Sequence, residues 1–465
     1  MISERLYNFC KKIFPYFLIV TALSYFIVPY FPRSSLSIGG KQIFITQIGM
    51  VVGILIASIL TWYECRVQER IVPRALVLPG ISLFAFLGSI TVATFLNTSF
   101  YEALLRISPV ISIVLITGMF SVVGQRTTNI FLYLTGFVVL ASSLLGIIQF
   151  FFLGDAAAPA TYLSGAPRTF YATGFANFSS LFGASLTLFI PLFWGLALNK
   201  QDNRRPLWTA IFLVSISALI VSFSRSALIG CGIGVAIVLI DAWISGIERR
   251  FLICSGIAAI VICAITVLYV PPVSFRSPDL PKEATVLSLL DDRFNFVSEV
   301  TTVMSSSSDG EGNSKTLAAI KDYSAYSRYA FHQAAFSMIF HSSYRFFFGY
   351  GLTGFADNWL AFKPGDSTLS ALRPDPHSAF LEVLVSTGVF GFFFFALFLY
   401  RLLYELFRIR FQETLAIPCI AALSGILIDG LFHTHFYSKY VWIFVGLGIS
   451  IVWNRYMSEK EIVIH

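Results

Sequence analysis

Charged residues are scarce in this sequence. They make up 12% of the 465 residues, whereas 56% are hydrophobic, and a soluble domain carries about 25% charged residues. So few charges cannot cover a globule in water, which excludes an ordinary soluble protein. The net charge of +7 comes from short basic clusters between apolar runs. That pattern is typical of membrane topology, and we predict no binding of nucleic acid.

Other features are missing as well. None of the six cysteines lies in the long polar segment 271–376, so no structural disulfide is available there. The apolar stretch that follows the basic N-terminal residues has no small-residue cleavage site behind it, and we interpret it as a first membrane helix. His433-Thr434-His435 is the closest approach to a metal-binding spacing, and cysteine ligands are absent from the outer segment. The adjacent Asp291 and Asp292 are a candidate carboxylate pair for a divalent ion, but solvated loop charges explain them more simply. We therefore predict neither a metal nor a cofactor.

What the sequence has in abundance is apolar runs. A spanning helix needs about 20 apolar residues, and this criterion predicts twelve helices. They lie over 13–31, 42–62, 75–96, 102–123, 129–153, 174–198, 207–223, 226–245, 251–270, 378–403, 414–432 and 438–454.

The basic residues predict the orientation. With the N-terminus inside, the short cytoplasmic segments hold 17 Lys and Arg residues and the short outer segments hold 5. Because cytoplasmic loops carry the excess of Lys and Arg, both termini are expected in the cytoplasm. We predict an all-α integral membrane protein of about 12 transmembrane helices in the bacterial inner membrane. Residues 1–270 hold helices 1–9, 271–376 form a large periplasmic loop with amphipathic helices, and 377–465 hold helices 10–12.

Arg225 stands at the outer junction of two apolar runs, within Ser-Phe-Ser-Arg-Ser. A guanidinium at that depth is costly unless it meets an anion. An arginine that reaches to the membrane surface without binding a ligand is an equally good interpretation.

A second arginine, Arg328, lies in a stretch of helical periodicity over 323–341. It is followed by Arg345 and by a Gly-Tyr-Gly turn at Gly349 and Gly351. Glycines let backbone N–H groups approach a phosphate, so these residues are candidates for substrate binding. An ordinary turn beside a helix end is the simpler alternative.

His377 stands with Ser378 at the head of an apolar helix, at the outer water–lipid boundary. A histidine there can act as a base near neutral pH, although a residue that merely starts the helix explains it too. Glu382 either orients this histidine or is an acid that the helix dipole favours.

The motifs resemble the O-antigen ligase family. His377-Ser378, nine residues, Gly388, two residues and Gly391 are similar to its histidine signature, and Phe-Ser-Arg-Ser at 223–226 is similar to its Ser-Arg motif. The run from Arg328 to Phe355 resembles its arginine-led helix and Gly-x-Gly turn, although the proline usual before that turn is replaced by phenylalanine. The resemblance covers about residues 210–395.

This resemblance implies a metal-independent inverting glycosyltransferase that faces the periplasm. Its donor would be a glycan on undecaprenyl diphosphate, held by Arg225 and Arg328, and its acceptor would be lipid A–core, activated by His377. Polymerisation of repeat units on the carrier and glycosylation of protein remain open. A transporter is a different class of alternative, but transporters place ionisable groups near the bilayer midplane, whereas here they gather at the outer ends of the runs.

Overall fold

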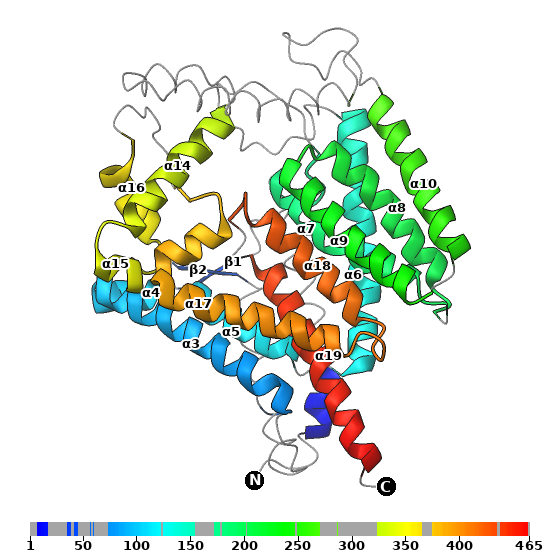
Figure 1. The fold of residues 1–465 in the computed structure, drawn as a ribbon, viewed down its shortest axis with the longest axis horizontal. Helices are drawn as coiled ribbons and strands as arrows, with labels where there is room; N and C mark the ends of the chain where they lie inside the picture. Colours follow the sequence, from blue (N-terminus) through cyan, green and yellow to red (C-terminus); the bar gives the residue numbers. More distant parts are fainter. Residues whose placement is uncertain are drawn as a thin grey trace.

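The computed structural model describes most of the helical part of the chain. The described residues are 7–16, 35–38, 41–44, 56, 59, 73–121, 124–153, 172–176, 179–200, 202–246, 249–269, 286, 323–364, 374–434 and 438–463. They are almost entirely helical (Figure 1). The exception is an antiparallel pair of short strands, β1 (Ser35–Ile38) and β2 (Lys41–Phe44).

Seven helical segments in the described part are long and apolar enough to cross a membrane. They are α3 (Arg74–Asn97), α4 with α5 (Phe100–Arg106 and Ser108–Ser121), α6 with its π-helical end (Gln125–Ile148 and Gln149–Leu153), α7 (Ser179–Ala197), α9 (Arg225–Ile244), α10 (Arg249–Leu268) and α17 (Ala379–Arg408). This confirms the prediction of an all-α, multi-pass membrane protein.

Shorter or more polar helices complete the architecture. Two are apolar, α8 (Arg205–Val221) and α18 (Ala416–Asp429), and α19 (Lys439–Val463) follows them. Three lie in the predicted outer segment, α14 (Tyr323–Ile339), α15 (Ser343–Phe348) and α16 (Gly354–Phe362). Described helices thus lie over ten of the twelve predicted ranges. The first two ranges fall largely outside the described residues, and β2 lies at the start of the second, so the count of about twelve stays a prediction.

The helices form two groups that share α18 and α19. α17 packs along α3, and α19 packs against α5. In the second group, α7 contacts α8, α9 and α18 (Figure 1). α7 is the centre of that group. Of its apolar stretch, 78% is buried inside the protein, compared with 17% of the apolar stretch of α10. Stacked aromatic rings fill its surroundings: Phe193 lies on Trp208 with centroids 5.4 Å apart, and Trp194 lies on Phe212 at 5.1 Å.

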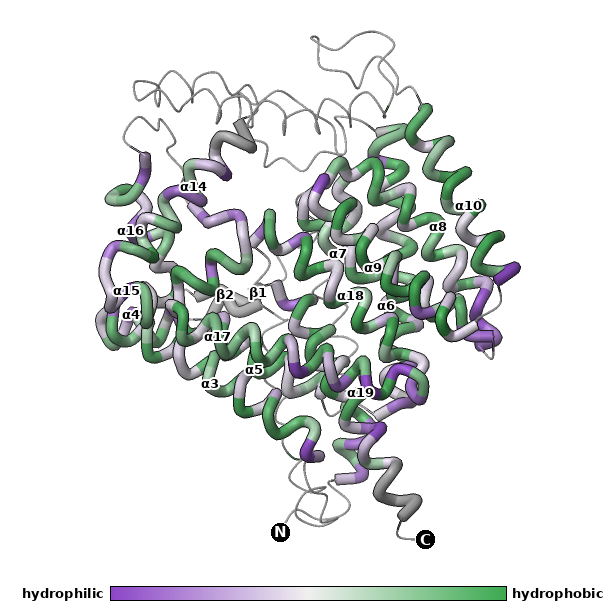
Figure 2. Tube along the Cα trace, viewed as in Figure 1, coloured by the Kyte–Doolittle hydropathy of each residue, from purple (hydrophilic) through white to green (hydrophobic). Residues whose placement is uncertain are grey.

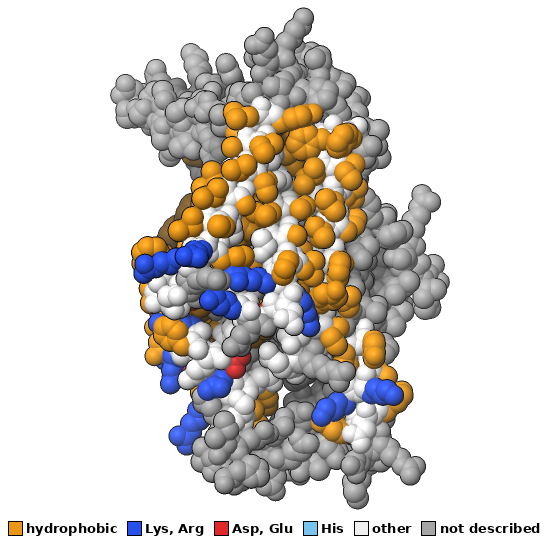
Figure 3. All heavy atoms as spheres, turned by 90° about the vertical axis from the view of Figure 1, so that its right-hand side faces the viewer, with side chains coloured by type: hydrophobic (Ala, Val, Ile, Leu, Met, Phe, Trp, Pro, Cys, Tyr) orange, Lys and Arg blue, Asp and Glu red, His pale blue; other side chains and the backbone are white. Residues whose placement is uncertain are grey.

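The outward surface of the second group is apolar. Hydrophobic residues cover the lengths of the helices and hydrophilic ones gather near their ends (Figure 2). Seen from the side, a broad hydrophobic surface ends at a row of Lys and Arg side chains (Figure 3). α8 and α10 begin at Arg205 and Arg249. A basic row below an apolar surface is the arrangement that the cytoplasmic side of a membrane favours.

α9 and α18 approach each other through glycine. A Cβ atom on Gly230 would lie 2.4 Å from the carbonyl oxygen of Gly425, and one on Gly425 would lie 2.9 Å from that of Gly230. Between helices in lipid there is no hydrophobic driving force. They associate through close packing instead, which small residues such as glycine allow. This contact holds α18 against α9, and the ends of both helices contribute to the site described below.

We expect Gly230→Leu to lower the free energy of unfolding by about 1–3 kcal/mol, because a leucine there overpacks the interface. Gly232→Leu on the same helix is the matched control, since a Cβ atom at Gly232 meets nothing within 4 Å. Thermal unfolding midpoints in detergent measure both variants. Equal midpoints would contradict a tight α9–α18 contact.

Candidate functional site

A cluster of polar side chains lies where four segments meet at the ends of apolar helices. The first turn of α9 contributes Ser226, α14 contributes Arg328, the chain before α17 contributes His377, and the chain after α18 contributes His433. These segments lie far apart in the sequence, and hydrogen bonds join them.

His433 is the residue that contacts most of these segments. Its Nδ1 lies 2.8 Å from Ser226 Oγ and 3.2 Å from Asp429 Oδ1, while its Nε2 lies 3.4 Å from Arg328 Nη2. Its carbonyl oxygen accepts a hydrogen bond from the backbone N–H of Ala379, the first residue of α17, at 3.1 Å. The histidine is 9% exposed, so these contacts replace water.

A guanidinium only donates hydrogen bonds, so a hydrogen bond between Arg328 and His433 uses Nε2 as the acceptor. In that tautomer Nδ1 carries a proton that it can donate to the buried carboxylate of Asp429. His433 thus orients Arg328 within the cluster.

His377 lies in a strained turn held by Asp375. Its φ is 46°, in the left-handed region that non-glycine residues rarely adopt. One oxygen of Asp375 accepts from the backbone N–H of His377 at 2.8 Å, lies 3.3 Å from its Nδ1, and accepts from Thr434 Oγ1 at 2.8 Å. Phe331 packs beside the imidazole with ring centroids 5.4 Å apart. The carboxylate thus fixes both the backbone and the ring.

Burial and charge set the pKa of His377. Burial lowers it, Asp375 raises it, and the positive charge of Arg328 and the neighbouring imidazoles of His433 and His332 lower it, so the net pKa lies below the ordinary 6.5. The imidazole is therefore neutral at pH 7. Its Nδ1 faces Asp375, so Nε2 is the nitrogen that can accept a proton.

His332 connects α14 to the same turn. Burial and Arg328 lower its pKa, and hydrogen bonds to the carbonyl groups of His377 and Pro376 raise it, with a net decrease. Because Arg328 and His332 are four residues apart on one helix, α14 presents both to the cluster.

Arg225 begins α9, directly before Ser226. The preceding turn is tight: Phe223 has a φ of 53°, and Ser222 Oγ accepts from the N–H of Ser224 at 3.3 Å. Ser226 bonds to His433, and His433 contacts Arg328. The structure therefore brings the segment of Arg225 together with Arg328 and His377, although more than 150 residues separate the first from the last.

Arg345, Gly349 and Gly351 do not form the expected phosphate cradle. The guanidinium of Arg345 contacts Asn97 Oδ1 and lies over the ring of Tyr350, 4.4 Å from its centroid. The N–H of Gly349 is donated to the carbonyl of Arg345 and that of Gly351 to the carbonyl of Ser386, both at 2.9 Å. Donors already used in the fold cannot also bind a phosphate, so the structure gives this turn a packing role.

Ser378 and Glu382 both lie in the first turn of α17. Ser378 is its N-cap, and its hydroxyl accepts from the N–H of Leu381 at 3.4 Å. This is a helix-capping role rather than an observed contact with a ligand. In Glu382, the oxygen Oε2 is buried and has no hydrogen-bond partner among the described residues. Glu382 therefore stays a candidate for substrate binding.

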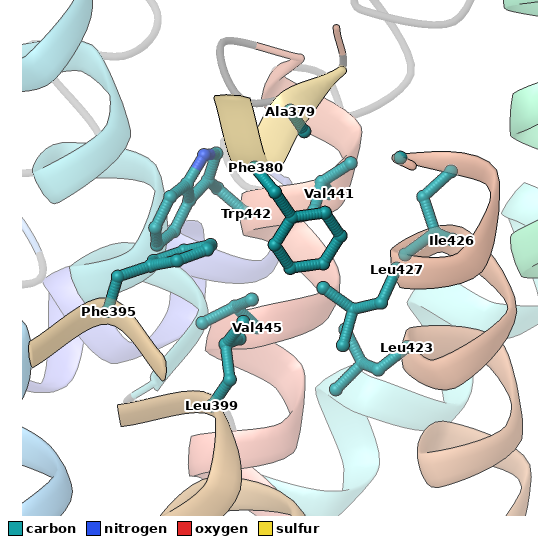
Figure 4. Close-up of a pocket in the computed structure, with 11 residues that line it drawn as sticks. Ala379, Phe380, Phe395, Leu399, Leu423, Ile426, Leu427, Val441, Trp442 and Val445 are labelled. Atoms are coloured by element: carbon teal, nitrogen blue, oxygen red, sulfur yellow. The ribbon is translucent and has the colours of Figure 1, made fainter. Parts of the chain in front are cut away.

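An apolar cavity of about 520 Å³, its open mouth included, lies between α17, α18 and α19 (Figure 4). Ala379 and Phe380 line it at the start of α17, immediately after His377 and Ser378, and Gly430 lines it at the end of α18. The cavity therefore adjoins the polar cluster. Its other lining residues are Phe395, Leu399, Leu423, Ile426, Leu427, Val441, Trp442 and Val445.

A second apolar cavity, of about 480 Å³, lies between α6, α7 and the first turn of α19. Tyr440 lines this cavity, whereas the next two residues, Val441 and Trp442, line the first.

Among the described residues, no group of three His, Cys, Asp or Glu side chains is placed to hold a metal ion, and His435 lies outside the described residues.

Residues 210–396 match the family model of O-antigen ligase. The matched stretch, which we name the ligase domain, is similar to that family and covers less than half of the chain. The match runs from α8 into α17, and Arg225, Arg328 and His377 lie within it. No curated protein matches the chain.

The ligase domain ends before α18, so the site extends beyond it. Asp429 and His433 lie outside the match. From the sequence, His433 was considered for metal binding only, and Asp429 was not predicted as a site residue. Their spacing of four residues was the available signal. Ser226, directly after Arg225, and Asp375, two residues before His377, were not predicted as site residues.

We expect Asp375→Asn to lower the pKa of His377 further, because the carboxylate raises that pKa and an amide carries no charge. The protonation of the imidazole then shifts to lower pH, as followed by NMR of ¹⁵N-labelled histidine. Asp357→Asn on α16 removes a carboxylate that does not act on His377 and serves as the control. An unchanged or raised pKa in Asp375→Asn would contradict the arrangement.

Proposed function

We propose that this protein transfers a preassembled glycan from undecaprenyl diphosphate to lipid A–core. It would act as an inverting, metal-independent glycosyltransferase at the periplasmic face of the bacterial inner membrane, with both termini in the cytoplasm. The ligase domain supports the reaction class. The observation that carries the proposal is the convergence of Arg328, His377 and the segment of Arg225 on His433.

Arg225 and Arg328 hold the diphosphate of the donor in this proposal. A guanidinium binds phosphate oxygens bidentately, and it stabilises the negative charge that develops as the glycosidic bond breaks. The contact of His433 with Arg328 supports this role, because it orients the guanidinium.

His377 is the general base in this proposal. Nε2 accepts the proton of the acceptor hydroxyl, the hydroxyl oxygen forms a bond to the anomeric carbon, and the bond from that carbon to the diphosphate oxygen breaks. The diphosphate leaves with the electron pair from the opposite face, so the configuration inverts. The lowered pKa of His377 supports this role, because the imidazole is neutral at pH 7.

The cavity between α17, α18 and α19 is suited to the hydrocarbon chain of the donor. It adjoins the polar cluster at Ala379 and Gly430, and its lining is apolar. A lipid whose diphosphate lies at the arginines thus has an apolar surface next to its first carbon atoms, and burying that chain favours binding.

A purified assay with lipid-linked glycan tests the function. Lipid A–core and, separately, further lipid-linked glycan are offered as acceptors, and the growing product is identified by gel electrophoresis. We expect lipid A–core to be extended, with chelator having no effect. Growth of the carrier-linked glycan alone would identify a polymerase. Donor that is never consumed, in protein shown to be folded, would remove the transferase proposal.

We expect His377→Ala to reduce turnover at least 100-fold, since general-base catalysis contributes about 10²–10⁴-fold. His341→Ala is the matched control, because His341 packs against Phe362 at a ring distance of 5.1 Å and lies in no contact with the cluster. Turnover within a few-fold of the unchanged protein in His377→Ala would remove this histidine as the base.

Two substitutions of His433 separate orientation of Arg328 from simple packing. In His433→Gln the amide lies near the position of Nε2 and can accept from Arg328, whereas in His433→Asn the amide lies near Nδ1 and can bond only Ser226 or Asp429. We expect the KM for the donor to be at least tenfold higher in His433→Asn than in His433→Gln. Equal effects of both variants on KM would give His433 a packing role only.

A further inference from the structure

α17 is interrupted inside its membrane-spanning length. Gly388 has φ 64° and ψ −172°, which is not helical. Gly388 is the tenth residue of the helix, about 14 Å along its axis at 1.5 Å per residue. A break at that depth removes the N–H partners of the preceding carbonyls, and in lipid such carbonyls must be satisfied by other parts of the protein.

The chain after α15 supplies the missing donors. Tyr350 N–H donates to the carbonyl of Val385 at 2.8 Å, and Gly351 N–H donates to that of Ser386 at 2.9 Å. On the other side, Leu352 N–H donates to Thr94 Oγ1 of α3 at 3.0 Å. The segment 349–352 therefore lies between two spanning helices.

This insertion leaves no room for side chains at two positions. A Cβ atom on Gly349 would lie 2.6 Å from the backbone of Gly388, and one on Gly351 would lie 2.7 Å from Cα of Thr94. Both glycines also have φ near +70° to +80°, which side chains disfavour. The two glycines are thus explained by a close approach to α3 and α17.

The charge in this segment points inward. Arg345 contacts Asn97 Oδ1, the carbonyl of Gly349 at 3.3 Å and the ring of Tyr350. The outward surface of α15 is aromatic instead: Tyr344, Phe347 and Phe348 are 42–45% exposed. Their rings continue to Phe390 of α17, whose centroid lies 5.5 Å from that of Phe347 and 5.7 Å from that of Phe348.

Phe390 itself is 49% exposed on a spanning helix, so it faces acyl chains. We propose that residues 342–352, which we name the re-entrant segment, are inserted into the outer leaflet beside α3 and α17 (Figure 1). The partner of its aromatic surface is the acyl chains and the headgroup region of the membrane. Aromatic side chains with one polar end, such as tyrosine, favour that boundary.

The insertion fixes the height of α14 above the membrane. Tyr350 Oη donates to the carbonyl of Met338 in α14 at 3.2 Å, and Phe331, Met338, Tyr350 and Val385 belong to one buried cluster. A segment held in the leaflet therefore holds the helix that carries Arg328. This consequence rests on the proposed function, whereas the contact with lipid does not.

Spin-label accessibility tests the insertion. Single cysteines at 347, 348 and 390 are introduced into cysteine-free full-length protein, labelled with a nitroxide and reconstituted in phosphatidylcholine–phosphatidylglycerol vesicles. Relaxation by dissolved oxygen is compared with relaxation by a water-soluble nickel chelate. We expect labels at 347 and 348 to resemble the label at 390, with at least threefold more relaxation by oxygen than by nickel.

The exposed Gln333 of α14 provides the aqueous control, and its label is expected to respond more strongly to nickel. Monodisperse elution in size-exclusion chromatography shows that each labelled variant is folded. Labels at 347 and 348 that respond like the one at 333, while the one at 390 responds to oxygen, would overturn the proposal. No activity is measured, so this outcome leaves the transferase proposal untouched.

Discussion

The hydrogen bonds of His433 join α14 and the start of α17 to the packed pair of α9 and α18. The imidazole bonds Ser226 on α9, Asp429 on α18 and Arg328 on α14, and its carbonyl bonds the start of α17. Buried polar groups must be paired, because an unpaired one costs about 1–3 kcal/mol. The four segments are therefore constrained to one relative arrangement.

The arrangement also explains where the backbone is strained. Phe223 and His377 both have positive φ values. Phe223 lies between Ser222 and Ser224, which are hydrogen-bonded to each other, and the N–H of His377 donates to Asp375. Such conformations cost about 1–3 kcal/mol and persist where surrounding contacts determine them. Here Ser222 and Asp375 supply those contacts, so the packed bundle maintains the geometry that the polar cluster requires.

A second constraint comes from the broken helix α17. Its interruption at Gly388 would leave carbonyl groups unsatisfied in lipid, and the glycine turn at 349–352 supplies the donors. Tyr350 of the same turn belongs to the buried cluster that includes residues of α14. The glycine at 388 and the Gly-Tyr-Gly turn, which are separate motifs in the sequence, are therefore two sides of one contact.

The sequence by itself determined the membrane class, the ranges of ten described helices and the motif residues Arg225, Arg328 and His377. Apolar run length and helical periodicity are local properties, so reading them requires no knowledge of packing. Only the tertiary structure decided that the N–H groups of Gly349 and Gly351 are used inside the fold. It also decided that Asp429 and His433, beyond the ligase domain, join the cluster. Both depend on which distant segments meet, and the sequence pattern carries no information about that distance in space.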